Sequence, residues 1–230
     1  MTVDRTLHHF PLDPASRQVR LALGEKRLAF ADAPTRYWER PKELTKLNPS
    51  GMVPVLVETP QDGARPLVLC ETRAILDHLE EAYPEAPLLG TDPAERAEAR
   101  RLLTWFDRKF EFEASGYILH EKIEKRLLSL GPPELANLRQ GREGLKTHLF
   151  YLEELLGERE WLAGKRLSLA DFAAAAHLSV IDYFGDVPWP EFPQVKTWYM
   201  KLKSRPCFRP LLTDRWPGLT PAPHYDDLDF

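Results

Sequence analysis

The chain has 230 residues, of which 43% are hydrophobic and 29% are charged, and its formal net charge is −4. This composition is typical of a soluble globular protein, and the length favours two domains of ordinary size over one. The small negative charge excludes a strongly basic nucleic-acid-binding protein, because no basic stripe is available to neutralise phosphates.

The two cysteines, Cys70 and Cys207, are too few for a disulfide framework or a metal cluster, so we expect no metal site. The N-terminal residues contain no apolar core of a signal peptide. No apolar run approaches the roughly 18 residues of a membrane span. These features together predict a cytoplasmic protein.

The first elements predicted are a strand over residues 6–10 and a helix over residues 16–24. Ser16 suits the N-cap of this helix and Gly24 its C-terminal end. His8 and His9 alternate along the strand, so one faces inward and one outward. A core or surface role suits these histidines better than that of a general base.

A second strand is predicted over residues 28–33, and a short helix ends near Leu47. Between them, Tyr37 and Trp38 are adjacent, so one ring can pack inward while the other faces outward. An outward Trp38 close to arginines has the composition of a protein-interface hot spot. Alternatively, Trp38 folds back and packs within its own segment.

The stretch from Asn48 to Leu56 combines a turn cluster with an apolar run that has Pro54 at its head, where a missing N–H breaks no ladder bond. A cis peptide after Val53 would turn the Val53 backbone groups away from the sheet, free to pair with an extended ligand. A β-prone run over residues 66–70 then leads into a helix opened by Glu71 and Thr72. The N-terminus of this helix attracts a carboxylate.

A strand headed by Gly51-x-x-Pro54, a second strand, and Glu71-Thr72 opening a helix resemble the thioredoxin-like domain of the glutathione transferase superfamily. The resemblance implies the GST fold, with an α/β thioredoxin-like domain over residues 1–83 and an all-α C-terminal domain. In that family the peptide before the proline pairs with the cysteinyl backbone of glutathione, and the acid–hydroxyl pair holds its γ-glutamyl end. By this resemblance Val53, Pro54, Glu71 and Thr72 form a possible glutathione site.

The superfamily also uses the turn before the first helix to supply a Ser or Cys that activates or replaces the glutathione thiol. The two usual places for that residue correspond to Asp13 and Ala15, and neither offers a thiol or hydroxyl. A carboxylate disfavours a nearby thiolate by like-charge repulsion. Ser16 is the remaining candidate, although a helix-capping role suits it better. We therefore assign no catalytic residue and expect that glutathione is not a required cofactor.

The second half of the chain reads as helical after a proline-rich linker at residues 84–91. The helical domain is predicted over residues 92–214, and its first helix carries an aromatic-rich face. In the superfamily that helix helps form the dimer interface and the wall of the second-substrate pocket. Ser168-x-x-Asp171 predicts a capping box at the start of a buried helix and matches the superfamily's signature at this place.

The last segment, residues 215–230, is predicted to be an extended tail because its prolines exclude helix. Its end combines three aspartates with three apolar side chains, a composition typical of an interaction peptide, although a frayed terminus is the alternative. The candidate partner-binding residues are Tyr37, Trp38, Tyr225, Asp226, Asp227, Leu228, Asp229 and Phe230.

A closer resemblance covers the whole chain and includes Tyr37-Trp38, the Asp13-Pro14 turn and the ending from His224 to Phe230. It is to the GST-like bacterial division proteins of the FzlA type, which bind FtsZ, the tubulin-like division filament, and act as dimers. This resemblance implies a non-catalytic homodimer at the division site that modulates the bundling or curvature of FtsZ filaments. The alternatives are a glutathione-dependent transferase or reductase, and a dimeric scaffold for a different partner.

Overall fold

The computed structural model describes residues 3–228 of the chain. Contacts divide the chain into two compact units, unit 1 ending at Ala86 and unit 2 beginning at Pro87. This division falls inside the segment 84–91 that the prolines predict as a linker.

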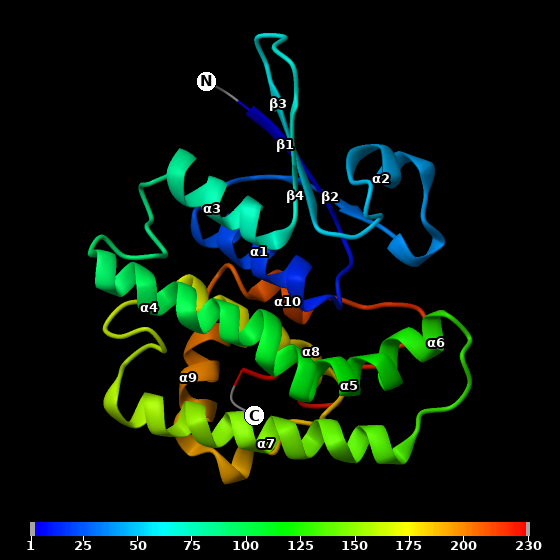
Figure 1. Ribbon diagram of the computed structural model, residues 1–230, viewed down its shortest axis with the longest axis vertical. Helices are drawn as coiled ribbons and strands as arrows, with labels where there is room; N and C mark the ends of the chain where they lie inside the picture. Colours follow the sequence, from blue (N-terminus) through cyan, green and yellow to red (C-terminus); the bar gives the residue numbers. More distant parts are fainter. Residues whose placement is uncertain (1–2, 229–230) are drawn as a thin grey trace. The chain divides into compact units, whose positions relative to one another are not determined.

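Unit 1 is built on a four-stranded mixed sheet in the order β2-β1-β3-β4. The strands are β1 (Val3–His9), β2 (Ala31–Pro34), β3 (Val55–Pro60) and β4 (Leu67–Cys70). β1 is parallel to β2 and antiparallel to β3, which is in turn antiparallel to β4. The parallel β1–β2 pair requires a crossover connection, and α1 supplies it. Figure 1 shows α1 and α3 on one side of the sheet and α2 on the other.

The helices of unit 1 are α1 (Pro14–Glu25), the 3₁₀ turn η1 (Tyr37–Glu39), α2 (Lys42–Leu47) and α3 (Thr72–Ala82). The start of α1 differs from the sequence prediction. Asp13, not Ser16, is the N-cap, because its carboxylate accepts a hydrogen bond of 2.8 Å from the Ser16 backbone N–H. Pro14 occupies the first helical position, where its missing N–H breaks no bond. Ser16 therefore lies inside the first turn of the helix.

A buried carboxylate ties the sheet of unit 1 to α3. Glu58 on β3 accepts hydrogen bonds from Arg5 Nε on β1 (2.8 Å) and from Tyr83 Oη just after α3 (2.7 Å), and its second oxygen lies 2.9 Å from His78 Nε2. Burial opposes ionisation, but the hydrogen bonds from Tyr83, His78 and Arg5 hold the pKa of Glu58 below its ordinary value. A charged carboxylate therefore joins three elements of unit 1.

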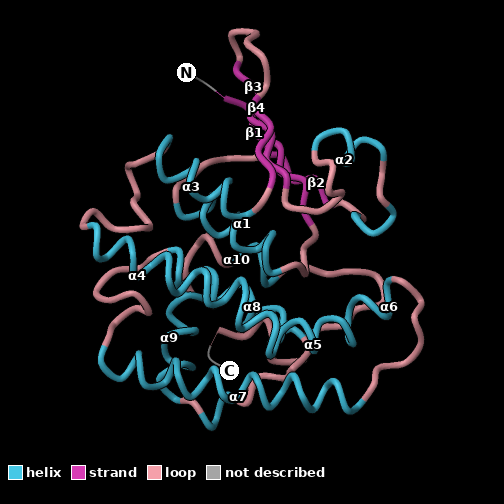
Figure 2. The backbone as a smooth tube through the Cα atoms, in the orientation of Figure 1, coloured by secondary structure: helices cyan, strands magenta, loops and turns pink. Residues whose placement is uncertain are grey.

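Unit 2 is all-helical, and a continuous helix runs through its first five elements (Figure 2). These are α4 (Pro93–Thr104), η2 (Trp105–Ser115), α5 (Gly116–Leu119), η3 (His120–Glu124) and α6 (Lys125–Leu127), with η2 and η3 wound as wider π-type turns. The remaining elements are α7 (Leu135–Glu158), α8 (Leu169–Tyr183), η4 (Trp189–Glu191), α9 (Pro193–Lys203) and α10 (Arg209–Leu212).

α7 packs against η2 at a close helix–helix contact that requires glycine. A Cβ atom at Gly144 would lie 1.9 Å from the backbone oxygen of Glu113, and one at Gly141 would lie 2.8 Å from the Ile118 side chain. The two backbones can approach this closely because neither glycine carries a side chain. α7 continues through Gly157 and ends at Glu158.

α8 is the central helix of unit 2, and all 15 of its residues are buried. A helix that is hydrophobic on every side is expected at the centre of a core. The predicted capping box is present at its start: Asp171 Oδ2 accepts the Ser168 backbone N–H at 2.8 Å, and the Asp171 N–H is capped in return by the Ser168 side chain. This prediction from the Ser-x-x-Asp pattern is confirmed.

The long helix that runs from α4 to α6 is joined to the start of α7 by a contact whose strength depends on pH. Glu121 accepts hydrogen bonds from Asn137 Nδ2 (2.7 Å) and the Glu134 N–H (2.7 Å), and it pairs with Lys125 Nζ (2.8 Å). Burial alone would raise the pKa of Glu121, but these partners lower it from 4.5 to about 2. A carboxyl group whose pKa is lower in the folded than in the unfolded protein stabilises the fold fully at pH values above its unfolded-state pKa. This stabilisation is lost as the pH falls through the folded-state pKa.

We therefore expect Glu121→Gln to destabilise the protein at pH 7 but to lose less further stability than the wild type between pH 4.5 and pH 2. The midpoint of urea unfolding at pH 7, 4 and 3 measures this difference. Glu143→Gln, at an exposed glutamate of α7, is the matched control and should follow the wild-type curve. Parallel acid losses in the wild type and Glu121→Gln would contradict the assignment.

Candidate functional site

The turn before α1, where the superfamily places its thiol-activating group, is closed by its own hydrogen bonds. Ser16 Oγ donates to Asp13 Oδ2 at 2.6 Å and accepts the Phe10 N–H at 3.3 Å. Ser16 is 0% exposed. Because its hydroxyl proton is already donated to Asp13, Ser16 has no free donor to stabilise a thiolate in this conformation.

The Asp13 carboxylate in the same turn is committed to the helix end. Burial raises the pKa of Asp13, against the lowering effect of its hydrogen bonds from Ser16 and Ala15 and of the nearby Arg17 charge. Ala15 contributes no hydrogen-bonding side chain. The Asp13 and Ser16 side chains of this turn are therefore used by the helix cap.

The segment before β3 has the conformation that the sequence predicts, with a cis peptide bond between Val53 and Pro54. Asn48 organises this loop: its Nδ2 donates to the Met52 carbonyl at 3.0 Å, and its Oδ1 accepts the Ser50 N–H at 3.2 Å. Val53 and Pro54 are both buried side chains. The loop is therefore held in one shape by the side chain of a buried asparagine at the start of the predicted turn.

Glu71 and Thr72 lie at the N-terminus of α3, as predicted. Glu71 is the exposed N-cap residue, with φ +70°, and Thr72 is the first residue of the helix. The preceding residue, Cys70, is half-buried, and its Sγ lies 3.4 Å from the Leu47 carbonyl oxygen. Burial and the neighbouring charge of Glu71 raise the pKa of the Cys70 thiol, so Cys70 is not an activated nucleophile.

Tyr37 and Trp38, which lie on the 3₁₀ turn η1, form an aromatic cluster with Phe10. Trp38 meets the buried Phe10 ring edge-on at a centroid distance of 5.3 Å, and Tyr37 meets Trp38 edge-on at the same distance. Both Tyr37 and Trp38 are half-buried. Trp38 therefore packs against the core through Phe10 and is also partly exposed, and its role as an interface residue stays a prediction.

The segment after α10 was expected to be an extended tail, but its described part folds back across unit 2 (Figure 1). Tyr225 is 0% exposed, and its hydroxyl donates to the Leu211 carbonyl at 3.0 Å. Its ring also contacts Tyr183 at a centroid distance of 5.0 Å. The proposal of Tyr225 as a partner contact is therefore wrong for this conformation, because its side chain belongs to the core.

The described end of the tail is open to solvent. Asp226, Asp227 and Leu228 are all exposed, and Asp226 Oδ2 also accepts a hydrogen bond of 3.1 Å from Arg215. The remaining two candidates, Asp229 and Phe230, lie outside the described residues. Of the candidate tail residues that the structure describes, Asp226, Asp227 and Leu228 are therefore the accessible ones.

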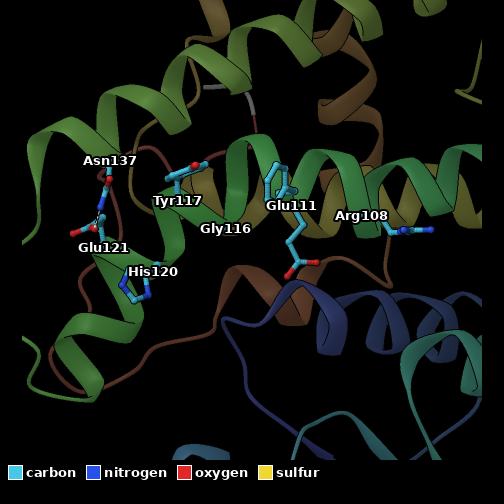
Figure 3. A pocket seen from close by; sticks show the side chains of 8 residues that line it. Arg108, Glu111, Gly116, Tyr117, His120, Glu121 and Asn137 are labelled. Carbon is cyan, nitrogen blue, oxygen red and sulfur yellow. Dashed lines mark hydrogen bonds between the residues drawn. The ribbon is translucent and has the colours of Figure 1, made fainter.

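Unit 2 also carries a pocket of about 520 Å³ on the long helix, shown in Figure 3. Phe112, which is 76% exposed, and Tyr117 form its apolar side, and Arg108 and Glu111 add charges. His120 also lines the pocket, with its Nδ1 atom 2.7 Å from Glu124 Oε2. Neither a cysteine nor a serine is among the described residues that line it, and Tyr117 supplies a phenol hydroxyl, so the pocket is suited to binding an apolar group beside a polar one.

Comparison with known proteins places these features in a family. Models of the N-terminal and C-terminal domains of glutathione S-transferase match residues 7–87 and 121–206. The sequence is 74% identical over all 230 residues, the full length of both chains, to "FtsZ-localized protein A" of Caulobacter vibrioides. The chain belongs to the FzlA-type glutathione S-transferase family.

Solved structures agree with this assignment. FzlA from C. crescentus superimposes with a TM-score of 0.96 at 74% identity, covering 99% of this chain and 100% of that one. A glutathione S-transferase from Rhodospirillum rubrum superimposes with a TM-score of 0.93 at 49% identity, covering 98% of this chain and all of that one. The GST fold predicted from the sequence is confirmed.

Two further properties of the structure bear on the site. Among the described residues, no helix has the length and apolar character needed to cross a bilayer. Within residues 3–228 there is likewise no cluster of His, Cys, Asp or Glu suited to hold a metal ion. The candidate binding surfaces of this FzlA-type protein are the aromatic cluster around Trp38, the pocket on the long helix and the folded tail.

Proposed function

We propose that the protein is a non-catalytic, GST-like protein that binds FtsZ filaments as a dimer and modulates their bundling or curvature during bacterial cell division. The observation that carries this proposal is the 74% identity over the full chain to a protein named for its localisation with FtsZ. Its site of action would be the division site, and it would need no cofactor.

The turn before α1 supports a role without chemistry. A glutathione-dependent enzyme needs a hydrogen bond or positive charge that lowers the pKa of the thiol. Here Asp13 and Ala15 stand where that group is expected, and Ser16 donates its proton to Asp13. Val53, Pro54, Glu71 and Thr72 would then be a retained glutathione site without an activator.

A dimer would give this function a geometric basis. A two-fold dimer presents two copies of each surface, so it can bridge two filaments or favour one filament curvature. We propose that Trp38 and Tyr37 on unit 1 and Asp227 and Leu228 on unit 2 contact FtsZ. Aromatic rings that are partly buried in the free protein make strong contacts at little entropic cost, while exposed aspartates give charge complementarity.

Charge reversal in the tail tests this surface. We expect Asp227→Lys to weaken binding to GTP-polymerised FtsZ by about tenfold and to make it less sensitive to salt, because an attraction between opposite charges is lost. The fraction that sediments with polymer, measured from 50 to 300 mM salt, reports both effects. Glu154→Lys makes the same charge change at an exposed position of α7 and should bind as the wild type does. Equal co-sedimentation of Asp227→Lys and wild type would contradict the tail assignment.

The alternative function is a glutathione-dependent transferase or reductase, and the similarity to the Rhodospirillum rubrum glutathione S-transferase favours it. Two assays separate it from the proposal: conjugation of glutathione to a generic electrophile, and a thermal shift on adding glutathione. Robust turnover would support the enzyme. A thermal shift without turnover would indicate a ligand site retained for another use. A dimeric scaffold for a different partner would show neither turnover nor FtsZ binding.

A further inference from the structure

The tail of the chain is held to unit 2 by hydrogen bonds along its described length. Tyr183 Oη donates to the Leu219 carbonyl at 2.8 Å, and the Ala222 N–H donates to the Tyr183 carbonyl at 2.7 Å. Further along, Tyr225 Oη donates to Leu211 on α10. These contacts fix the path of the tail from the end of α8 to the end of α10.

Two buried charges complete this clamp. Asp182, which is fully buried on α8, accepts the Trp189 indole N–H at 2.8 Å and lies 2.9 Å from His224 Nε2 of the tail. Lys203, buried at the end of α9, donates from Nζ to the Asp227 carbonyl oxygen. Hydrogen bonds to charged groups are stronger than those between neutral groups. The backbone at Asp227 is therefore positioned by a buried ammonium group.

The clamped tail forms one wall of a hollow of about 470 Å³. Leu212 of α10 and Leu228 of the tail are its apolar side chains, and Arg209, Arg215 and Asp226 are its charged ones. Arg215 is satisfied by Asp226 and by the backbone carbonyls of Leu212 and Asp214. Arg209 is exposed and, among residues 3–228, has no hydrogen-bond or ion-pair partner.

The charges of the hollow indicate what it can accept. Among the described residues that line the hollow, two arginines and one aspartate leave one positive charge uncompensated, and the Arg215–Asp226 pair assigns that charge to Arg209. A guanidinium group presents a planar fork that matches a carboxylate. The hollow is thus complementary to an apolar side chain that lies beside an acidic residue.

We propose that the clamped tail and α10 form a docking hollow that receives an apolar side chain of FtsZ together with a neighbouring carboxylate, which pairs with Arg209. This inference rests on the proposed function and refines it in two ways. First, Arg209 contributes to the recognition of FtsZ in addition to Asp227. Second, Lys203 is a positioning residue that keeps the tail in place as a wall of the hollow. Asp226 acts within the hollow by orienting Arg215.

The test uses the full chain and GTP-polymerised FtsZ in co-sedimentation. Arg209→Glu is expected to weaken binding by about tenfold, because it turns an attraction into a repulsion. Arg139→Glu makes the same change at an exposed arginine of α7 and should leave binding within twofold of the wild type. Equal binding of Arg209→Glu and wild type would overturn the proposed hollow.

The clamp has a separate readout that does not depend on FtsZ. The Asp227 amide donates to the His224 carbonyl at 3.1 Å, so its hydrogen exchange reports tail opening. Lys203→Met and the gentler Tyr225→Phe should both speed this exchange, and Lys203→Met should also weaken FtsZ binding. Unchanged exchange in both variants would overturn the clamp. Absence of wild-type binding would instead overturn the proposed function, and with it the identity of the occupant.

Discussion

Replacing Asp171 by alanine is expected to lower the free energy of unfolding by about 3–5 kcal/mol, because several buried donors lose their shared hydrogen-bond acceptor at once. Asp171 is 0% exposed and accepts four hydrogen bonds. The Ser168 N–H and Oγ donate to Oδ2 at 2.8 Å each, and the Leu162 N–H and Trp198 Nε1 donate to Oδ1 at 2.9 Å each. Alanine leaves all four donors buried without this acceptor.

Chemical denaturation followed by far-UV circular dichroism measures this change. Ser168→Ala serves as the graded control, because it removes one hydroxyl from the capping box and should lower the free energy of unfolding by only about 1 kcal/mol. An Asp171→Ala variant that loses less than Ser168→Ala would show that the network around the start of α8 is not a major source of stability.

The second large effect is expected at Trp38. We predict that Trp38→Ala weakens binding to FtsZ polymer between tenfold and a hundredfold, in the range of interface hot spots of about 2 kcal/mol or more. Its ring rests edge-on against Phe10, so the free protein already holds it in one orientation and little entropy is lost when a partner covers it. Co-sedimentation at a series of polymer concentrations gives the ratio of dissociation constants.

Trp38→Phe separates the aromatic contact from the indole itself. It keeps a ring that can pack on Phe10 and should retain much of the affinity that Trp38→Ala loses. Thermal unfolding of both variants shows whether the fold is intact. If Trp38→Ala is folded and still sediments with FtsZ as the wild type does, Trp38 is not a contact and serves only to pack η1 against Phe10.

The sequence predicted local features whose physical cause is also local. The capping box at Ser168 and Asp171 involves two residues three positions apart, so the pattern alone identifies it. The turn at Asn48–Gly51, Pro54 and the helix opened by Glu71 and Thr72 were enough to indicate the thioredoxin-like domain, since each needs a particular residue at a particular backbone position.

The predictions from the sequence are wrong where distant residues or competing local signals decide the structure. Asp13-Pro14 competes with Ser16 as a helix start, and the proline at the first position settles the choice in favour of Asp13. The burial of Tyr225 depends on Tyr183 and Leu211, which are far from it in the sequence and which no pattern within the tail reveals. For the same reason, no pattern within the sequence indicates that Lys203 binds the Asp227 carbonyl oxygen.

Low-speed sedimentation of FtsZ with and without the protein tests the proposed bridging of filaments most directly. With GTP and no glutathione, a dimer that carries two FtsZ-binding surfaces should move FtsZ into the low-speed pellet, and with GDP it should not. Trp38→Ala and Asp227→Lys should each leave FtsZ in the supernatant. FtsZ that remains in the supernatant with the wild-type protein, together with rapid conjugation of glutathione to an electrophile by the same preparation, would contradict the proposed function.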